Sequence, residues 1–173
     1  MKTILSEQQL SITIQRLCHQ ILENHIDLEN TVLIGLQPRG IYVSKRMVDQ
    51  LKKQVDTGRV LYGNLDITFY RDDIRKELHK ANHTNIPFSI ESKNVILVDD
   101  VLYTGRTIRA ALDALLDYGR PAKVELCVLI DRRFSRQLPI QPDYVGKAID
   151  SIISQKVKVY WNEKDGKEEV TLL

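Results

Sequence analysis

Two adjacent carboxylates and a threonine-containing turn lie in the middle of the chain. Asp99 and Asp100 end the apolar run Val95–Val98, and the turn Tyr103–Thr107 (YTGRT) follows shortly after. Backbone N–H groups at the start of a helix, threonine hydroxyls and a glycine that permits close approach together suit a phosphate group. The two carboxylates are suited to accept hydrogen bonds from sugar hydroxyls, directly or through a divalent ion. This stretch therefore predicts a sugar phosphate as ligand.

The spacing of the stretch separates it from two other phosphate-binding motifs. It matches neither G-x-x-x-x-G-K-[ST] nor G-x-G-x-x-G, which argues against a P-loop NTPase and a Rossmann dinucleotide site. The simpler alternative is a strand that ends in solvent before an ordinary helix cap. The turn after Asp99 and Asp100 favours the sugar-phosphate interpretation.

Length and composition indicate one domain of a soluble protein. The chain has 173 residues, and we expect a single domain over residues 1–173. Its 25 Lys and Arg against 23 Asp and Glu give a net charge of +2, so no global charge favours nucleic acid or a membrane. The N-terminus turns polar by the sixth residue, and no signal peptide or membrane span is expected. Cys18 and Cys127 indicate a reduced interior, and hence the cytoplasm.

Hydrophobic periods and turn residues predict alternating helices and strands. Ser6 and Gln9 have the spacing of a capping box, and apolar residues recur at helical intervals after them. In chain order, the expected elements are a helix over Glu7–Asn24, a strand over Thr31–Leu36, a helix over Ile41–Gln54, a strand over Val60–Tyr70, an extended segment over Ile86–Ile90, a strand over Val95–Val98, a helix over Arg106–Tyr118, a strand over Lys123–Ile130 and a hairpin with strands over Lys156–Trp161 and Glu168–Leu172. We interpret the polar stretch Arg71–Asn85 as a flexible loop between edge strands.

This alternation predicts an α/β fold with a mostly parallel sheet. Ligands of such sheets bind beyond the carboxyl ends of the strands. Two loops follow strand ends of this kind: Gln37–Gly40, which contains Arg39, and Asp99–Thr107. Both loops are therefore candidates for the ligand site.

The sequence of the second loop resembles that of a known enzyme family. VILVDDVLYTGRT is similar to the signature of type I phosphoribosyltransferases, which bind 5-phosphoribosyl 1-diphosphate. The segments RGIYVSKRM, DITFYRDD, DALLDYGRP and LPIQPDYVGKAI then resemble, in this order and spacing, the pyrimidine-operon regulatory proteins that are also uracil phosphoribosyltransferases. The resemblance covers nearly the whole chain. It implies a type I phosphoribosyltransferase fold, with a mostly parallel central sheet flanked by helices, a small hood and a flexible β-loop.

The resemblance also implies which residues bind the donor. The two acids hold the ribose hydroxyls with Mg²⁺, the turn after them holds the 5-phosphate, and the loop around Arg39 holds the pyrophosphate. Arg71 begins, with Asp72 and Asp73, a loop that closes over the donor and excludes water. The implied catalytic residues are Asp99, Asp100, Arg39 and Arg71, and the implied metal ligands are Asp99 and Asp100. The implied donor-binding residues are Pro38, Arg39, Gly40, Asp99, Asp100, Val101, Leu102, Tyr103, Thr104, Gly105, Arg106 and Thr107.

The acceptor base is expected under a hood formed later in the chain. The implied nucleobase-binding residues are Arg132, Tyr144, Val145 and Lys147, with backbone groups at Val145 reading the edge of uracil. From the residues alone, Tyr144 is equally well interpreted as a core residue. His79 and His83 stand four residues apart, but no third ligand is evident, so they do not predict a metal site.

A second role follows from the same resemblance. Family members that bind messenger RNA are expected to use a basic face that contacts phosphates and loop bases. The RNA-binding residues expected here are Arg16, His19 and Arg136, beside Arg132, Arg133 and Lys147. The chain departs from the family pattern in this region, because Gln141 and Phe134 stand where Arg and His are usual and GKAIDS replaces GKNIPTS. The catalytic motifs are better preserved than this face.

The predicted function is thus an Mg²⁺-dependent uracil phosphoribosyltransferase in a cytoplasmic homo-oligomer, making UMP and pyrophosphate from uracil and the diphosphate donor. Its second predicted partner is leader messenger RNA, bound in response to UMP, and no membrane partner is expected. The alternatives are a purine phosphoribosyltransferase acting on hypoxanthine or guanine, and an RNA-binding attenuation regulator with little catalysis.

Overall fold

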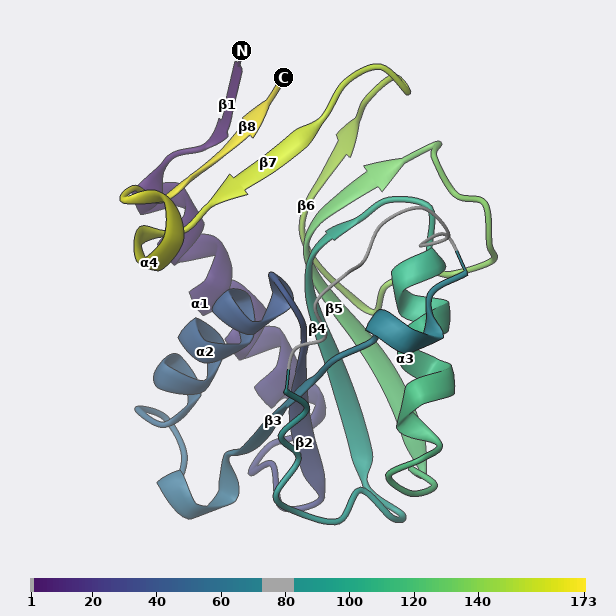
Figure 1. Cartoon of the computed structure of the whole chain (residues 1–173). Helices are drawn as coiled ribbons and strands as arrows, with labels where there is room; N and C mark the ends of the chain where they lie inside the picture. The colour runs from purple at the N-terminus through teal and green to yellow at the C-terminus, as the bar shows by residue number, and fades with distance from the viewer. Residues whose placement is uncertain (1, 73–82) are drawn as a thin grey trace.

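A five-stranded parallel sheet forms the centre of the protein (Figure 1). The computed structural model describes residues 2–72 and 83–173. The strands of this sheet are β2 (Thr31–Leu36), β3 (Leu61–Leu65), β4 (Asn94–Leu102), β5 (Lys123–Arg133) and β6 (Tyr144–Asp150). They lie in the order β3-β2-β4-β5-β6, so the carboxyl ends of β2 and β4 are adjacent. The predicted parallel α/β fold is confirmed.

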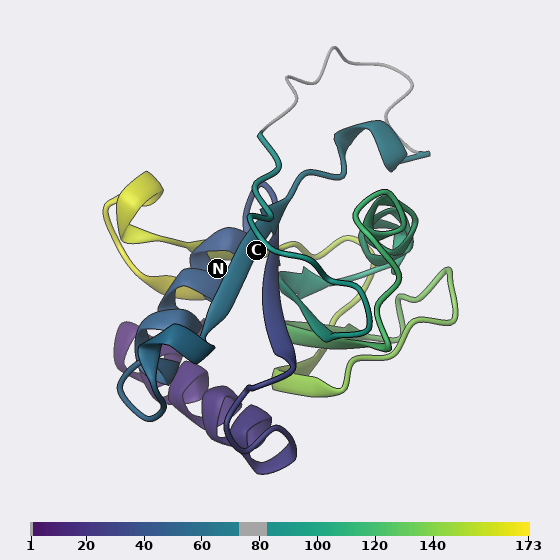
Figure 2. The same ribbon diagram turned by 90° about the horizontal axis from the view of Figure 1, so that it is seen from below.

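Helices cover both faces of this sheet (Figure 2). Helices α1 (Glu7–Asn24) and α2 (Gly40–Leu51) lie on one face, and α3 (Arg106–Leu115) lies on the other. The central strands are therefore apolar on both sides, and every residue of β2 is buried. In the described part of the chain, no helix is both long enough and apolar enough to cross a bilayer.

Helix α1 begins and ends where the sequence predicts. The Ser6 side chain accepts a hydrogen bond from the Gln9 backbone N–H, and the Gln9 side chain accepts one from the Ser6 backbone N–H. This capping box satisfies two backbone donors that the first turn leaves free. The apolar face of α1 then packs against β5, β6 and α2.

A second, three-stranded antiparallel sheet lies beside the carboxyl ends of the large sheet (Figure 1). It contains β1 (Lys2–Leu5), β8 (Glu169–Leu172) and β7 (Val157–Tyr160), with the short helix α4 (Asn162–Asp165) between β7 and β8. The predicted C-terminal hairpin is confirmed, and Gly166 adopts the left-handed conformation that ends α4. Leu5, Val159 and Val170 join the core cluster of α1 and α2, so both sheets share one apolar core.

Three predicted elements differ from the structure. The expected strand Val60–Tyr70 divides into β3 and a 3₁₀ turn at Thr68–Tyr70. The segment Ile86–Ile90 forms no strand, and an isolated bridge joins Asn85 to Asn64 instead. Strand β4 continues through the two acids to Leu102, because pairing with β5 extends to Asp131. Asp73, His79 and most of the predicted loop Arg71–Asn85 lie outside the described residues.

Candidate functional site

Two buried carboxylates lie near the carboxyl end of β4. Asp99 and Asp100 are each 8% exposed, and the Asp100 backbone N–H donates to Asp99 Oδ1 at 2.9 Å. Burial raises the pKa of Asp99 well above its ordinary value, the neighbouring Asp100 charge adds to this, and Arg71 lowers it. Burial also raises the pKa of Asp100, while Arg39 opposes the rise. A bound cation, or sugar hydroxyls that donate to the carboxylates, would favour the ionised forms.

The residues after β4 build a pocket. A cavity of about 310 Å³ is lined by Arg71, Asp99, Val101, Leu102, Tyr103, Thr104, Gly105, Arg106, Thr107, Ile108 and Gln137. Gly105 precedes α3 with φ of 92°, a conformation that favours glycine, and a Cβ there would lie 3.0 Å from Ile140 Cγ1. The first turn of α3 therefore opens beside this cavity, with backbone N–H groups that suit an anion.

The loop after β2 comes close to the same acids. Gly35 pairs with Val98, so the loop that leaves β2 begins beside Asp99. A Cβ on Gly40 would lie 2.4 Å from the Val98 carbonyl oxygen and 3.0 Å from Asp99 Cα. Only a residue without a side chain lets α2 begin this close to β4. Arg39 then reaches Asp100, with Nε 3.1 Å from Oδ2.

Charged groups connect the pocket to the segment that begins at Arg71. Arg71 lines the cavity, and its charge acts on Asp99. Arg106 contacts Asp72 Oδ2 through Nη1 at 2.8 Å and Gln137 Oε1 through Nε at 2.8 Å. The structure therefore brings the donor residues predicted from the sequence together from three separate segments.

Arg132 lies near the end of β5, beside the turn that follows β4. Its guanidinium carbon is 4.0 Å from the centre of the Tyr103 ring, and the side chain is almost fully buried. It donates to Ser151 Oγ at 2.9 Å and to the Gln155 carbonyl oxygen at 2.9 Å. Arg132 thus links the turn after β4 to the segment 151–155 that leads into β7.

The other residues predicted to bind the base lie elsewhere. Tyr144 is in the core on the α1 face, where its hydroxyl donates to Glu125 Oε2 at 2.9 Å and accepts from Asn24 Nδ2 at 3.1 Å. The Val145 side chain packs on the opposite face, and its carbonyl oxygen accepts from Arg16 at the outer edge of β6. Lys147 donates to the Ile4 carbonyl oxygen at 3.2 Å.

The reason for this difference is the register of β6. Tyr144 pairs with Cys127, whereas Asp131, at the carboxyl end of the sheet, pairs with Ala148. Tyr144 and Val145 therefore begin an edge strand below the level of the carboxyl ends of β4 and β5. The segment 151–155 instead contacts Arg132, whose guanidinium lies over the ring of Tyr103 in the pocket lining.

The three residues expected to bind RNA have different environments. Arg16 and His19 lie on the exposed face of α1, where Arg16 also donates to the Gly146 carbonyl oxygen. Arg136 instead forms an ion pair with Asp131 and donates to the Tyr103 carbonyl oxygen at 2.7 Å. The Arg136 guanidinium is therefore engaged by loops of the chain itself, and its contact with RNA stays a prediction.

Two residues at or near the site, Gln137 and Asp131, are not among those that the sequence predicts. Gln137 lines the cavity from an irregular segment, and nothing in its neighbours marks it. Asp131 ends a buried strand as the Asp99 pair does, and this shared pattern could have indicated it. Within residues 2–72 and 83–173, no cluster of three or more metal-ligating side chains is present. Two carboxylates still suit Mg²⁺, which usually takes its other ligands from water and substrate oxygens.

The parallel sheet, the paired acids and the glycine turn before α3 define a phosphoribosyltransferase. The family model for the phosphoribosyl transferase domain matches residues 1–164, and the chain belongs to this family. A bifunctional protein PyrR of Elusimicrobium minutum is 48% identical over 176 residues, covering 99% of this chain and 96% of the relative. The bifunctional protein PyrR of Bacillus subtilis is 42% identical over 173 residues, covering 98% and 94%. The predicted membership of the pyrimidine-operon regulatory group is confirmed.

Solved structures show the same fold. A hypoxanthine phosphoribosyltransferase of Trypanosoma cruzi superposes with a TM-score of 0.76 at 19% identity, covering 100% of this chain and 96% of the other. One from Staphylococcus aureus gives a TM-score of 0.74 at 18% identity, covering 98% and 90%. The predicted type I phosphoribosyltransferase fold is confirmed, and at this identity the likeness extends to the fold alone.

Proposed function

We propose that this protein transfers the ribosyl 5-phosphate of 5-phosphoribosyl 1-diphosphate to uracil, making UMP and pyrophosphate. The observation that carries the proposal is the meeting of Asp99 and the turn before α3 at one cavity, with the buried Asp100 next to Asp99. The ring nitrogen of uracil forms a bond to the anomeric carbon while the bond to pyrophosphate breaks, and the nitrogen loses its proton. This reaction needs positioning and electrostatic stabilisation rather than a protein nucleophile.

Each group of residues has one task in this proposal. The backbone and hydroxyls of residues 104–107 bind the 5-phosphate, and Asp99 and Asp100 accept from the ribose hydroxyls. Arg39 and Arg71 neutralise the pyrophosphate as negative charge moves onto it. Asp99 and Asp100 would hold Mg²⁺, which supplies charge stabilisation to the diphosphate when bound.

The base site proposed here lies between Tyr103, Arg132 and the segment 151–155. Support comes from the short distance between Arg132 and Tyr103 and from the bonds of Arg132 to that segment. This location replaces the one first expected at Tyr144, Val145 and Lys147. Uracil as the acceptor is supported by the identity with bifunctional PyrR proteins over nearly the whole chain.

A regulatory role accompanies the transfer in this proposal. The relatives are named bifunctional, and the exposed Arg16 and His19 on α1 could contact RNA phosphates. We infer that the protein binds leader messenger RNA in response to UMP. We also infer that residues 1–173 form a single domain and that the protein is a homo-oligomer in the cytoplasm. Charge-neutral replacement of His19 and Arg16 should weaken RNA binding and reduce its salt dependence, while nucleotide synthesis continues.

One steady-state assay tests the proposed transfer. The protein is incubated with the diphosphate donor, Mg²⁺ and, in separate reactions, uracil, hypoxanthine, guanine or xanthine. Turnover with uracil alone is the expected result. Turnover with hypoxanthine or guanine but not with uracil would refute the proposal that uracil is the acceptor base. No turnover with any base, together with UMP-stimulated binding to leader RNA, would refute the enzymatic role and leave the regulatory one.

A further inference from the structure

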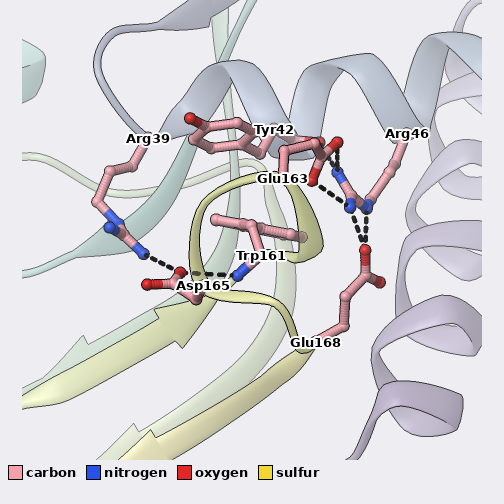
Figure 3. Close-up of polar contacts among 7 residues, drawn as sticks. All are labelled: Arg39, Tyr42, Arg46, Trp161, Glu163, Asp165 and Glu168. Carbon is pink, nitrogen blue, oxygen red and sulfur yellow. Dashed lines mark hydrogen bonds and ion pairs between the residues drawn. The ribbon is translucent and has the colours of Figure 1, made fainter.

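One face of α2 carries three side chains that contact the C-terminal hairpin, residues 157–172. Arg39, Tyr42 and Arg46 are spaced by three and four residues, so they lie on the same side of the helix. Figure 3 shows these side chains directed toward Trp161, Glu163, Asp165 and Glu168 of the hairpin. The helix that begins at the proposed pyrophosphate loop is thus joined to a segment about 120 residues later in the chain.

Trp161 fixes the hairpin against this face. Its side chain is fully buried, and its ring is stacked on Tyr42 with centroids 6.0 Å apart. The Arg46 guanidinium carbon lies 4.6 Å from the centre of the same ring. Arg46 also forms ion pairs with Glu163, at 2.9 Å, and with Glu168. The hairpin is therefore held at several points that do not include Arg39.

Asp165 has a fixed position within the hairpin. The Trp161 backbone N–H donates to Asp165 Oδ2 at 3.0 Å, and the Asp165 backbone N–H donates to the Trp161 carbonyl oxygen at 2.7 Å. The same Oδ2 lies 3.9 Å from Arg39 Nη2, and the Asp165 side chain is 16% exposed. A negative charge is therefore placed beside Arg39 by backbone geometry rather than by a flexible side chain alone.

Arg39 is oriented by groups from three parts of the chain. Nε donates to Asp100, and Nη2 donates to the Val159 carbonyl oxygen and faces Asp165. Nη1 has no hydrogen-bond partner within residues 2–72 and 83–173. Because guanidinium donors are arranged in a rigid plane, fixing Nε and Nη2 also fixes the direction of Nη1. An arginine held in this way loses less rotamer entropy when an anion binds.

We propose that Asp165 and Trp161 are positioning residues, which hold Arg39 in the orientation that receives the pyrophosphate group of the donor. This inference rests on the proposed transfer from a diphosphate donor. In this role the hairpin acts through Arg39. The C-terminal segment therefore helps to determine the affinity for donor and product, in addition to closing the apolar core.

Asp165→Asn tests this inference with little change in shape. The amide oxygen can still accept from the Trp161 N–H, but the charge beside Arg39 is lost. We expect the KM for the diphosphate donor and the inhibition constant for inorganic pyrophosphate to rise about threefold to tenfold, the range of a partly screened ion pair. The KM for uracil and the melting temperature should stay near the wild-type values.

Glu163→Gln is the matched control. It removes a carboxylate of the same hairpin from an arginine of the same helix, while Glu168 continues to bind Arg46. The KM for the donor and the inhibition constant for pyrophosphate should not change in this variant. Asp165→Glu should restore part of the affinity for donor and pyrophosphate that Asp165→Asn loses. These readouts separate positioning of Arg39 from a general effect on folding.

The outcomes distinguish this inference from the proposed function. If the wild-type protein transfers ribosyl phosphate and Asp165→Asn behaves as Glu163→Gln, the positioning role is refuted while the function stands. If Asp165→Asn lowers the donor KM, the role is also refuted, because Asp165 would then compete with the donor for Arg39. If the wild-type protein neither transfers ribosyl phosphate nor binds pyrophosphate, the proposed function fails and this inference fails with it.

Discussion

The close approach of α2 to β4 gives a direct test of the site geometry. Replacing Gly40 with alanine adds one methyl group at the point where the loop that contains Arg39 meets the acids. That Cβ would lie 2.4 Å from the Val98 carbonyl oxygen, 3.0 Å from Asp99 Cα and 3.2 Å from Asp99 Oδ1. Two of these three atoms belong to the backbone of a central strand, so a side-chain rotation cannot relieve the contact.

The size of the effect follows from these distances. Ordinary contact begins near 3.4 Å, so the loop and the start of α2 must move away from β4 by about 1 Å. Overpacking of this kind costs about 1 to 3 kcal/mol of unfolding free energy. A displacement of about 1 Å between the groups that hold the two halves of the donor is expected to lower kcat/KM by about 100-fold.

Two measurements and one control test this prediction. Urea unfolding gives the change in stability, and steady-state kinetics with the diphosphate donor give kcat/KM. Gly58→Ala is the matched control, because among the described residues the atom nearest to its Cβ would be Asp56 Oδ1 at 3.5 Å. We expect this control to stay within about 0.5 kcal/mol of the wild type. A Gly40→Ala protein with the stability and the kcat/KM of the Gly58→Ala control would refute the reasoning.

Three further predictions address the acids, the base site and the core. Because burial raises the folded-state pKa of Asp99, the folded protein binds more protons than the unfolded chain between the two pKa values, and stability falls as pH rises through that window. Asp99→Asn should therefore stabilise the protein more at pH 8 than at pH 4 in urea titrations, while transferase activity is lost; equal stabilisation at both pH values would contradict this. Arg132→Lys should lower the free energy of unfolding by about 1 to 2 kcal/mol, because lysine cannot reproduce the hydrogen bonds to Ser151 and Gln155. Faster amide hydrogen exchange across residues 151–155 would show that this segment is less tightly held. Tyr144→Phe should lower the free energy of unfolding by about 1 kcal/mol, because the hydrogen bond to Glu125 is lost. The KM for uracil should not change, and a changed KM would show that Tyr144 takes part in binding the base.

The part of the site that we propose binds the donor has a clear signal in the sequence, because its residues lie close together along the chain. Asp99, Asp100 and the turn Tyr103–Thr107 follow one another along a single strand, loop and helix start. Their geometry depends on the parallel sheet, which the buried strands already indicate. The pairing of Gly35 with Val98 then brings the loop of Arg39 to the same edge, as expected for loops that follow neighbouring parallel strands.

The part of the site that we propose binds the acceptor base could not be predicted in this way. Tyr144 and Val145 lie in a motif that resembles the family, yet the motif does not say at which level of the sheet β6 begins. Pairing of Tyr144 with Cys127 places it below the pocket and directs its hydroxyl to Glu125. Register is a property of two strands together, and a single segment does not contain it.

The sequence by itself determined the fold class and the family, and it predicted Asp99, Asp100 and the turn after them as the donor site, because short contiguous segments carry all three signals. Only the tertiary structure decided that Arg136 binds Asp131 instead of facing outward, and that segment 151–155 lies against Arg132. It also decided that the C-terminal hairpin reaches Arg39. These contacts join residues far apart in the chain, and the pairing and packing that create them exist only once the sheets have formed.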